Sequence, residues 1–197
     1  MNILLRGRAA KPIAFLLCLV PLALLAARVL LGALGANPVE AVTRFTGDWT
    51  LRFLLATLAI TPARRLLEWP DLIRFRRMLG LWAFFYGTLH LATWVCLDKF
   101  FDPADMWADV TKRRFITMGT AGFALMVPLA ITSTSGWIRR LGKRWRLLHR
   151  LAYLSAAAGV VHYWWLVKSD VRAPLLYGVV LATLLGARLM RRDVRPA

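Results

Sequence analysis

Six long apolar segments constrain the fold of this chain more than any other feature of its sequence. A bilayer core about 30 Å thick requires roughly 20 residues of α-helix. The chain has 59% hydrophobic residues and a mean hydropathy of +0.55, which is typical of a membrane protein. The sequence therefore predicts one all-α domain over residues 1–197, a polytopic six-transmembrane-helix bundle with spans at about residues 13–34, 45–62, 79–97, 115–138, 147–167 and 173–190.

The charged residues predict how this bundle is oriented. There are 27 Lys and Arg against 10 Asp and Glu, a net charge of +17. With the N-terminus in the cytoplasm, 18 basic residues lie on the cytoplasmic side, including Arg6, Arg8, Arg191, Arg192 and Arg195, and seven lie on the opposite side. This is the positive-inside distribution. We therefore expect both termini in the cytoplasm, and the surplus charge indicates a membrane topology in contact with lipid, not nucleic-acid binding.

Other classes of protein are excluded by the motifs that the sequence lacks. Its two cysteines, Cys18 and Cys96, both lie in apolar segments, so no disulfide scaffold and no four-cysteine metal site is expected. There is no GxGxxG, P-loop or GxSxG motif. The longest polar loop, residues 98–114, is too short for a soluble catalytic domain and is the candidate surface for docking a partner.

All three histidines fall within predicted spans, where ionisable groups are expensive and mark functional sites. His90 lies in the third span and His162 in the fifth, and both belong to the outer half of the bilayer by the rise of about 1.5 Å per residue. These two spans run in the same direction, so the two imidazoles can meet one iron from opposite faces. This arrangement predicts a b-type haem with His90 and His162 as ligands. The alternative is that each histidine only forms an interhelical hydrogen bond.

The third histidine predicts a second centre near the cytoplasmic surface. His149 precedes His162 by a rise of about 20 Å on one helix. The matching position before His90 is Arg76, followed by Arg77, and a guanidinium does not ordinarily ligate iron. It can pair with a haem propionate or a flavin phosphate. On an ideal helix, His149 and His162 would lie roughly 140° apart in azimuth, so two haems would require different azimuths or a bent helix.

Several local motifs carry a resemblance to a known family. They are Arg74-Phe-Arg-Arg-Met-Leu-Gly-Leu-Trp with His90-Leu downstream, the segment 53–62, Thr132-Ser-Thr-Ser, Leu141-Gly-Lys-Arg-Trp with Leu148-His-Arg, and His162-Tyr-Trp-Trp. With these motifs the chain resembles the MsrQ family, formerly YedZ, from about Gly35 to Arg188. That family belongs with the ferric-reductase-like transmembrane proteins.

The resemblance implies an electron relay in the bacterial cell inner membrane. Members of the family pass electrons from the cytoplasmic side, from the quinone pool or a cytosolic flavin reductase, through b-type haem to MsrP. MsrP is a periplasmic molybdopterin enzyme that reduces methionine sulfoxide in damaged envelope proteins. The resemblance thus implies an electron-transfer subunit, with haem iron held by His90, His162 and His149, and not the catalytic subunit itself.

The resemblance also implies FMN as a cofactor, without indicating its site. The basic residues of the cytoplasmic loops, including Arg76 and Arg77, are the candidates for its phosphate, because cations suit that group; they are Arg74, Arg76, Arg77, Lys143, Arg144 and Arg146. The alternative is that these residues only set the topology. Two other functions remain open: a ferric or quinone reductase that acts directly on a small substrate, and a proton-coupled transporter that uses its histidines without haem.

Overall fold

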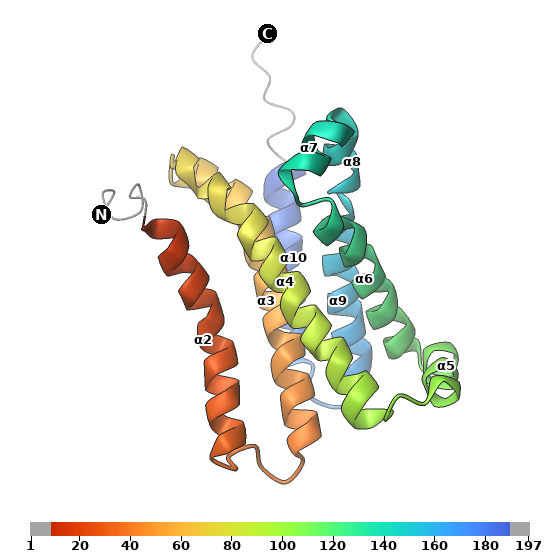
Figure 1. Cartoon of the computed structure of the whole chain (residues 1–197). Coiled ribbons are helices and arrows are strands. Elements are labelled where there is room, and N and C mark those ends of the chain that lie inside the picture. Colours follow the sequence, from red (N-terminus) through yellow and green to blue (C-terminus); the bar gives the residue numbers. More distant parts are fainter. Residues whose placement is uncertain (1–8, 190–197) are drawn as a thin grey trace.

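The structure, a computed structural model, describes residues 9–189, and within them it is all-α with no strand. Figure 1 shows most of the helices running side by side along one common direction. The helices are α2 (Ala10–Leu30), α3 (Pro38–Leu66), α4 (Ile73–Thr93), α5 (Pro103–Lys112), α6 (Arg114–Ile131), α7 (Ser135–Leu141), α8 (Lys143–Leu148), α9 (Leu151–Leu166) and α10 (Arg172–Leu189). A 3₁₀ turn, Pro70–Leu72, precedes α4, and a π-helical turn, Trp94–Asp98, follows it.

Each predicted span overlaps one main helix, although the number of membrane crossings stays a prediction. The helix α2, the segment Pro70–Asp98 and α6 are each long and apolar enough to cross a membrane. The helix α3 is longer but carries several charges, and α9 has only 16 residues. The terminal basic residues counted for the topology, from Arg6 and Arg8 to Arg191, Arg192 and Arg195, lie outside the described residues, as does Met190 at the end of the last predicted span.

The continuous helix in the predicted span 115–138 is shorter than that span, because α6 stops at Ile131. The Thr132 hydroxyl donates to the Pro128 carbonyl and the Ser133 hydroxyl donates to the Leu129 carbonyl. The Ser133 backbone bonds to the Ala130 carbonyl, three residues back, so the α-helical ladder stops here and the Ser133 hydroxyl satisfies the Leu129 carbonyl that the ladder leaves free. The side chain of Thr134 then accepts a hydrogen bond from the backbone of Trp137 and caps α7, so the chain changes direction here.

The predicted span 147–167 also begins too early. The helix α8 ends at Leu148, His149 and Arg150 form a turn, and α9 begins at Leu151. The turn is tightened by a hydrogen bond from the Arg150 backbone to the Leu147 carbonyl, 3.1 Å long. His149 and His162 therefore do not share one continuous helix. The azimuth of 140° expected from an ideal helix does not describe their relationship.

The bundle is built from two helical hairpins that pack against one another. The helix α3 packs along α4, and α6 packs along α9, while α10 covers α9 and α3. The most enclosed side chains of the bundle include Leu58, Tyr86 and Ser155. Figure 1 shows that α4 and α9 both run from the end where α7 and α8 lie toward the end where α5 lies. This common direction brings the C-terminal halves of α4 and α9 to the same level.

The first helix lies at the edge of the bundle and is held by one tyrosine (Figure 1). The hydroxyl of Tyr86 on α4 accepts a hydrogen bond from the Leu22 backbone and donates one to the Cys18 carbonyl, both 3.0 Å long. The hydroxyl thus lies between the Leu22 N–H and the Cys18 carbonyl, which would bond to each other directly in an unbroken helix. Pro21 lies beside this position, and a proline inside a helix opens its backbone ladder.

Candidate functional site

His90 and His162 face each other across the space between α4 and α9. Their ring centroids are 6.1 Å apart and the planes of the two rings make an angle of 79°. Two imidazoles bound to opposite sides of one metal ion, with metal–nitrogen bonds of about 2 Å, have ring centroids roughly 6 Å apart. The structure therefore brings together the two histidines that the sequence placed at similar depth, at a separation suited to a shared ligand.

Each of these histidines is oriented by a backbone carbonyl from the neighbouring helix. The Nδ1 atom of His90 lies 2.9 Å from the carbonyl oxygen of Thr43, and that of His162 lies 2.6 Å from the carbonyl oxygen of Phe115. A carbonyl can only accept, so Nδ1 carries the proton in both rings. The Nε2 atom is then unprotonated and available to a metal. Metal-binding histidines generally make this second hydrogen bond, which fixes the tautomer and the ring orientation.

Two glycines make room for the two imidazoles. A Cβ atom on Gly47 would lie 2.9 Å from Cε1 of His90, and one on Gly119 would lie 2.7 Å from Nδ1 of His162. Real side chains do not approach this closely, so only glycine allows the rings their positions. In each hairpin the orienting carbonyl precedes its histidine by 47 residues, and the glycine follows that carbonyl by one helical turn. The two halves of the site are thus built in the same way.

The histidines and glycines line a mainly apolar cavity of about 220 Å³ formed by α3, α4, α6 and α9. Gly87 and Gly159 line the same cavity, each three residues before its histidine. The other walls are mainly apolar and include Leu51, Leu54, Phe123 and Met126. A flat, apolar macrocycle with a metal centre fits this donor set and these walls. The glycines were not predicted as site residues, but the repeated Gly-x-x-His pattern at Gly87 and Gly159 was a signal that could have found them.

His149 lies apart from this cavity. Its Nε2 is 3.1 Å from the Thr132 hydroxyl, and its ring stacks on Trp145 with centroids 3.9 Å apart and an angle of 27°. The Trp145 indole also donates to the Thr132 carbonyl over 2.9 Å. Since the Thr132 hydroxyl gives its own proton to Pro128, it accepts from His149, so Nε2 carries the proton. Binding a metal through this nitrogen would require the bond to Thr132 to break.

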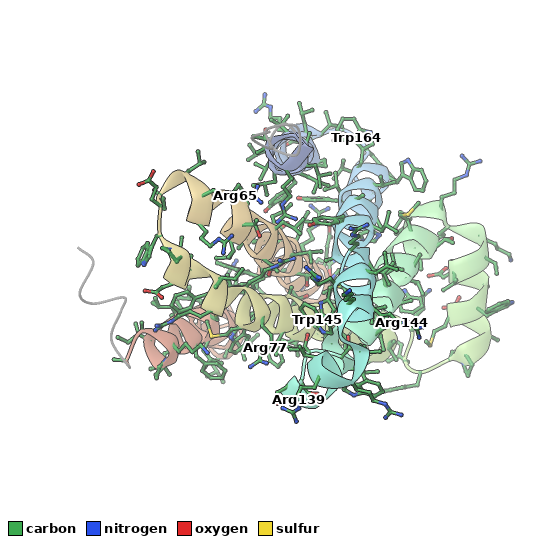
Figure 2. All side chains as sticks on the ribbon, turned by 90° about the horizontal axis from the view of Figure 1, so that it is seen from above. Arg65, Arg77, Arg139, Arg144, Trp145 and Trp164 are labelled. Atoms are coloured by element: carbon green, nitrogen blue, oxygen red, sulfur yellow. The ribbon has the colours of Figure 1, made fainter. Side chains whose placement is uncertain are left out.

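Arg76 approaches His149, whereas Arg77 is exposed to the surroundings. Arg76 lies within electrostatic range of both His149 and Arg188. The Arg188 guanidinium donates to the Tyr153 hydroxyl and to the Leu58 carbonyl. Figure 2 looks along the bundle from the end where α7 and α8 lie, and shows Arg77, Arg139 and Arg144 at this end, in the same region as Trp145. Of the predicted basic residues, Arg76 is thus the one that interacts electrostatically with His149, and none of the six lines the cavity of His90 and His162.

Comparisons with known proteins agree with this architecture. The ferric reductase like transmembrane component family matches residues 13–160. A protein from Herminiimonas arsenicoxydans is 54% identical over 91% of this chain and 84% of its own length. A Rhodospirillum rubrum protein is 52% identical over 94% of this chain and 89% of its own length. Both are named protein-methionine-sulfoxide reductase heme-binding subunit MsrQ.

The chain belongs to the MsrQ family. A third MsrQ protein, from Caulobacter vibrioides, is 52% identical over 87% of this chain and 82% of its own length. No solved structure matches the chain. The ferric-reductase match contains His90 and His149 but ends two residues before His162. The MsrQ relatives are matched over a larger share of the chain, and the geometry across α4 and α9 supplies the link between His90 and His162.

Proposed function

We propose that this chain is the haem-binding, electron-transferring membrane subunit of a methionine sulfoxide reductase system. The observation that carries the proposal is the His90–His162 pair, 6.1 Å apart, with both Nδ1 atoms engaged by backbone carbonyls. In this proposal the two Nε2 atoms hold the iron of a b-type haem. The bound haem would supply a centre that accepts and passes on one electron at a time.

The chain contributes the environment of this centre. The carbonyls of Thr43 and Phe115 keep both imidazoles in the neutral tautomer that a metal requires, and Gly47 and Gly119 keep the rings unobstructed. The apolar walls exclude water, so the electrostatic influence of nearby dipoles is stronger than in solvent. Such an environment suits a low-spin centre that transfers electrons without binding a further substrate.

The direction and the partners of the transfer are also part of the proposal. We assign the end of the bundle where α5 lies to the periplasm, because the positive-inside rule places the basic α7–α8 end in the cytoplasm. Electrons would enter from the quinone pool or a cytosolic flavin reductase and leave for MsrP, across the bacterial inner membrane. The names of the relatives support a place in methionine sulfoxide reduction. The position of His90 and His162 toward the α5 end supports delivery on that side (Figure 1).

His149 is proposed to hold a second haem near the cytoplasmic surface. Arg76 lies near it, and a guanidinium suits a propionate or a flavin phosphate. FMN would use the same basic surface, formed by Arg74, Arg76, Arg77, Lys143, Arg144 and Arg146. The bond between His149 and Thr132 is the structural cost of iron ligation here. In this proposal the inner haem therefore binds less firmly than the outer one.

The deciding experiment is haem quantification with redox-difference spectra on the purified full-length chain and on three variants. We expect His90→Ala and His162→Ala to lose the low-spin outer haem, and His149→Ala to retain it. Thr88→Ala, an exposed change on the same helix as His90, is the matched control. Unchanged spectra in both His90→Ala and His162→Ala would refute the ligand assignment, and a colourless wild type would favour the proton-coupled transporter.

A second experiment separates the relay from a reductase that acts on a small substrate itself. The wild-type chain, reduced in lipid vesicles, is mixed with purified MsrP or with a ferric chelate, and reoxidation of its haem is followed by stopped-flow absorbance. We expect rapid reoxidation by MsrP. Rapid reoxidation by the ferric chelate, with none by MsrP, would favour the direct ferric reductase.

A further inference from the structure

The segment between α4 and α6 has an unusual arrangement, because a lysine and an aspartate are buried in it while its large aromatic rings are exposed. Lys99 contacts Asp109 over 2.7 Å and Asp105 over 2.8 Å, and the side chains of Lys99 and Asp109 are each only 8% exposed. Arg113 adds a second contact to Asp109, 3.1 Å long. These ion pairs tie α5 to the π-helical turn at the end of α4.

Three large aromatic side chains of the same segment point away from these ion pairs. Phe100 is 78% exposed, Phe101 is 66% exposed and Trp107 is 72% exposed. Phe100 and Phe101 both have positive φ, 47° and 60°, a conformation that side chains of this kind rarely adopt. The chain thus accepts backbone strain in a turn that leaves both rings uncovered, which indicates that the rings contact something outside the bundle.

The orientation of α5 indicates what the rings contact. Figure 1 shows α5 almost end-on beside the start of α6, and Figure 2 shows it lengthwise at the periphery of the bundle. Its axis is therefore roughly perpendicular to the spanning helices and parallel to the plane of a membrane. Phe85 on α4 and Leu97 in the following turn are exposed as well, at 37% and 44%. In a membrane protein such exposed apolar side chains face lipid.

We propose that α5 and the preceding turn form an interfacial anchor, with Phe100, Phe101 and Trp107 inserted into the lipid leaflet at this end of the bundle. An amphipathic helix with aromatic residues on one face and cations beside it lies in the membrane interface in this way. The exposed cations Lys112, Arg113 and Arg114 follow directly and suit lipid phosphates. The occupant of the aromatic surface is therefore lipid and not a docked protein.

The anchor has a consequence for the candidate site. The segment joins the end of α4, which carries His90, to the start of α6, where the Phe115 carbonyl orients His162. Both halves of the site are therefore tied to one element at the membrane surface. Anchoring α5 in the lipid fixes the separation of α4 and α6 at the level of the two histidines.

The test is a depth measurement on the full-length chain in vesicles of phosphatidylethanolamine and phosphatidylglycerol. A nitroxide is attached at Trp107→Cys and, separately, at Phe101→Cys, in a Cys18→Ala/Cys96→Ala background. Ser169→Cys, at an exposed position in the loop between α9 and α10, is the control, because Asp102 caps α5 and cannot be replaced neutrally. We expect relaxation by oxygen, relative to relaxation by a water-soluble nickel complex, to be several-fold higher at positions 101 and 107 than at position 169.

Two outcomes would overturn the proposal. If the nickel complex reaches positions 101 and 107 as readily as position 169, the rings project into water. If the soluble periplasmic partner immobilises the label at position 107 while the lipid leaves it mobile, the surface docks a protein. Two label sites keep the test decisive where one substitution disturbs folding, and the haem spectrum of each variant reports whether the chain is folded.

Discussion

The Nδ1 atom of His162 lies 2.6 Å from the carbonyl oxygen of Phe115, and the residue one turn further along α6 is Gly119. The same relationship joins His90 to Thr43 and Gly47 on the other side of the cavity. One helix of each hairpin thus supplies a histidine, and the other supplies both the group that orients it and the space that it occupies.

Replacing Gly119 by alanine should therefore disable the site without removing a ligand. The new Cβ would lie 2.7 Å from Nδ1 of His162, so the ring must leave the Phe115 carbonyl or α6 must shift. We expect a several-fold lower ratio of haem to protein, measured by the pyridine haemochrome method. Gly186→Ala on α10, where a Cβ would have no neighbour within 4 Å, is the matched control. Full haem content in Gly119→Ala would contradict the proposed position of the haem.

Thr132→Val tests the proposed role of His149. The change removes the hydroxyl that holds Nε2 of His149 and leaves the stacking on Trp145 in place. We expect haem content per chain to rise, and His149→Ala to cancel the rise. Ser133→Ala is the control, because Ser133 bonds only to the Leu129 carbonyl in the same turn. If haem content is the same in the wild type, Thr132→Val and His149→Ala, then His149 is not an iron ligand.

The ion pairs of Lys99 predict a dependence of stability on pH. Its hydrogen bonds to Asp105 and Asp109 raise the pKa of Lys99 above its ordinary value. A raised pKa means that the stabilisation is fully present below the pKa of an unfolded lysine, about 10.4, and is lost as the pH rises through the folded value. We expect the contribution of Lys99 to the unfolding temperature to change little between neutral pH and about pH 10, and to be lost at higher pH.

Lys99→Met should lower the unfolding temperature at neutral pH and weaken this alkaline fall. The variant leaves the carboxylate of Asp109, which is 8% exposed, without its lysine partner. Lys112→Met, at an exposed position on the same segment, is the control and should resemble the wild type. An identical alkaline profile in the wild type and Lys99→Met would show that another group causes the loss of stability.

Arg188→Gln should loosen the attachment of α10. The guanidinium donates to the hydroxyl of Tyr153 on α9 and to the carbonyl of Leu58 on α3, so it joins three helices. Hydrogen bonds to a charged group typically contribute about 1.5–3 kcal/mol each, and partial exposure reduces this, so we expect a loss of roughly 1–3 kcal/mol. The free energy of unfolding in mixed micelles measures it, with Arg172→Gln at the opposite end of α10 as control. Equal losses in the two variants would contradict this role.

The helical fold could largely be predicted from the sequence, because an apolar segment of about 20 residues is a direct indication of a membrane helix. The pairing of His90 with His162 also followed, since the order of the spans fixes their directions and residue counting fixes their depth. The breaks at Thr132 and at His149 could not be predicted from hydropathy. Short polar stretches, Thr132 to Gly136 at the first break and His149–Arg150 at the second, are averaged out by the apolar residues on either side in a window of about 20 residues, and hydropathy does not report the cap at Thr134 or the turn at Arg150.

The glycines and α5 were missed for different reasons. Glycine is common in membrane helices as a packing residue, so Gly47 and Gly119 gain meaning only when their neighbours across the cavity are known. In the segment that follows α4, the burial of Lys99 and the exposure of Phe100 and Phe101 reverse the pattern expected of a polar loop. That reversal depends on the ion pairs of Lys99 with Asp105 and Asp109, and the hydrophobic periodicity of the sequence does not reveal these pairs.

The bridge that Tyr86 makes between Leu22 and Cys18 fixes the axial position of α2. If only apolar side chains held the first helix, a shift of one turn along α4 would change the packing energy little, because apolar contacts are not directional. The Tyr86 hydroxyl, in contrast, can bond to the α2 backbone only where the hydrogen bond between Leu22 and Cys18 is open. The hydroxyl oxygen of Tyr86 thus sets the register of α2, a helix at the edge of the bundle, against α4.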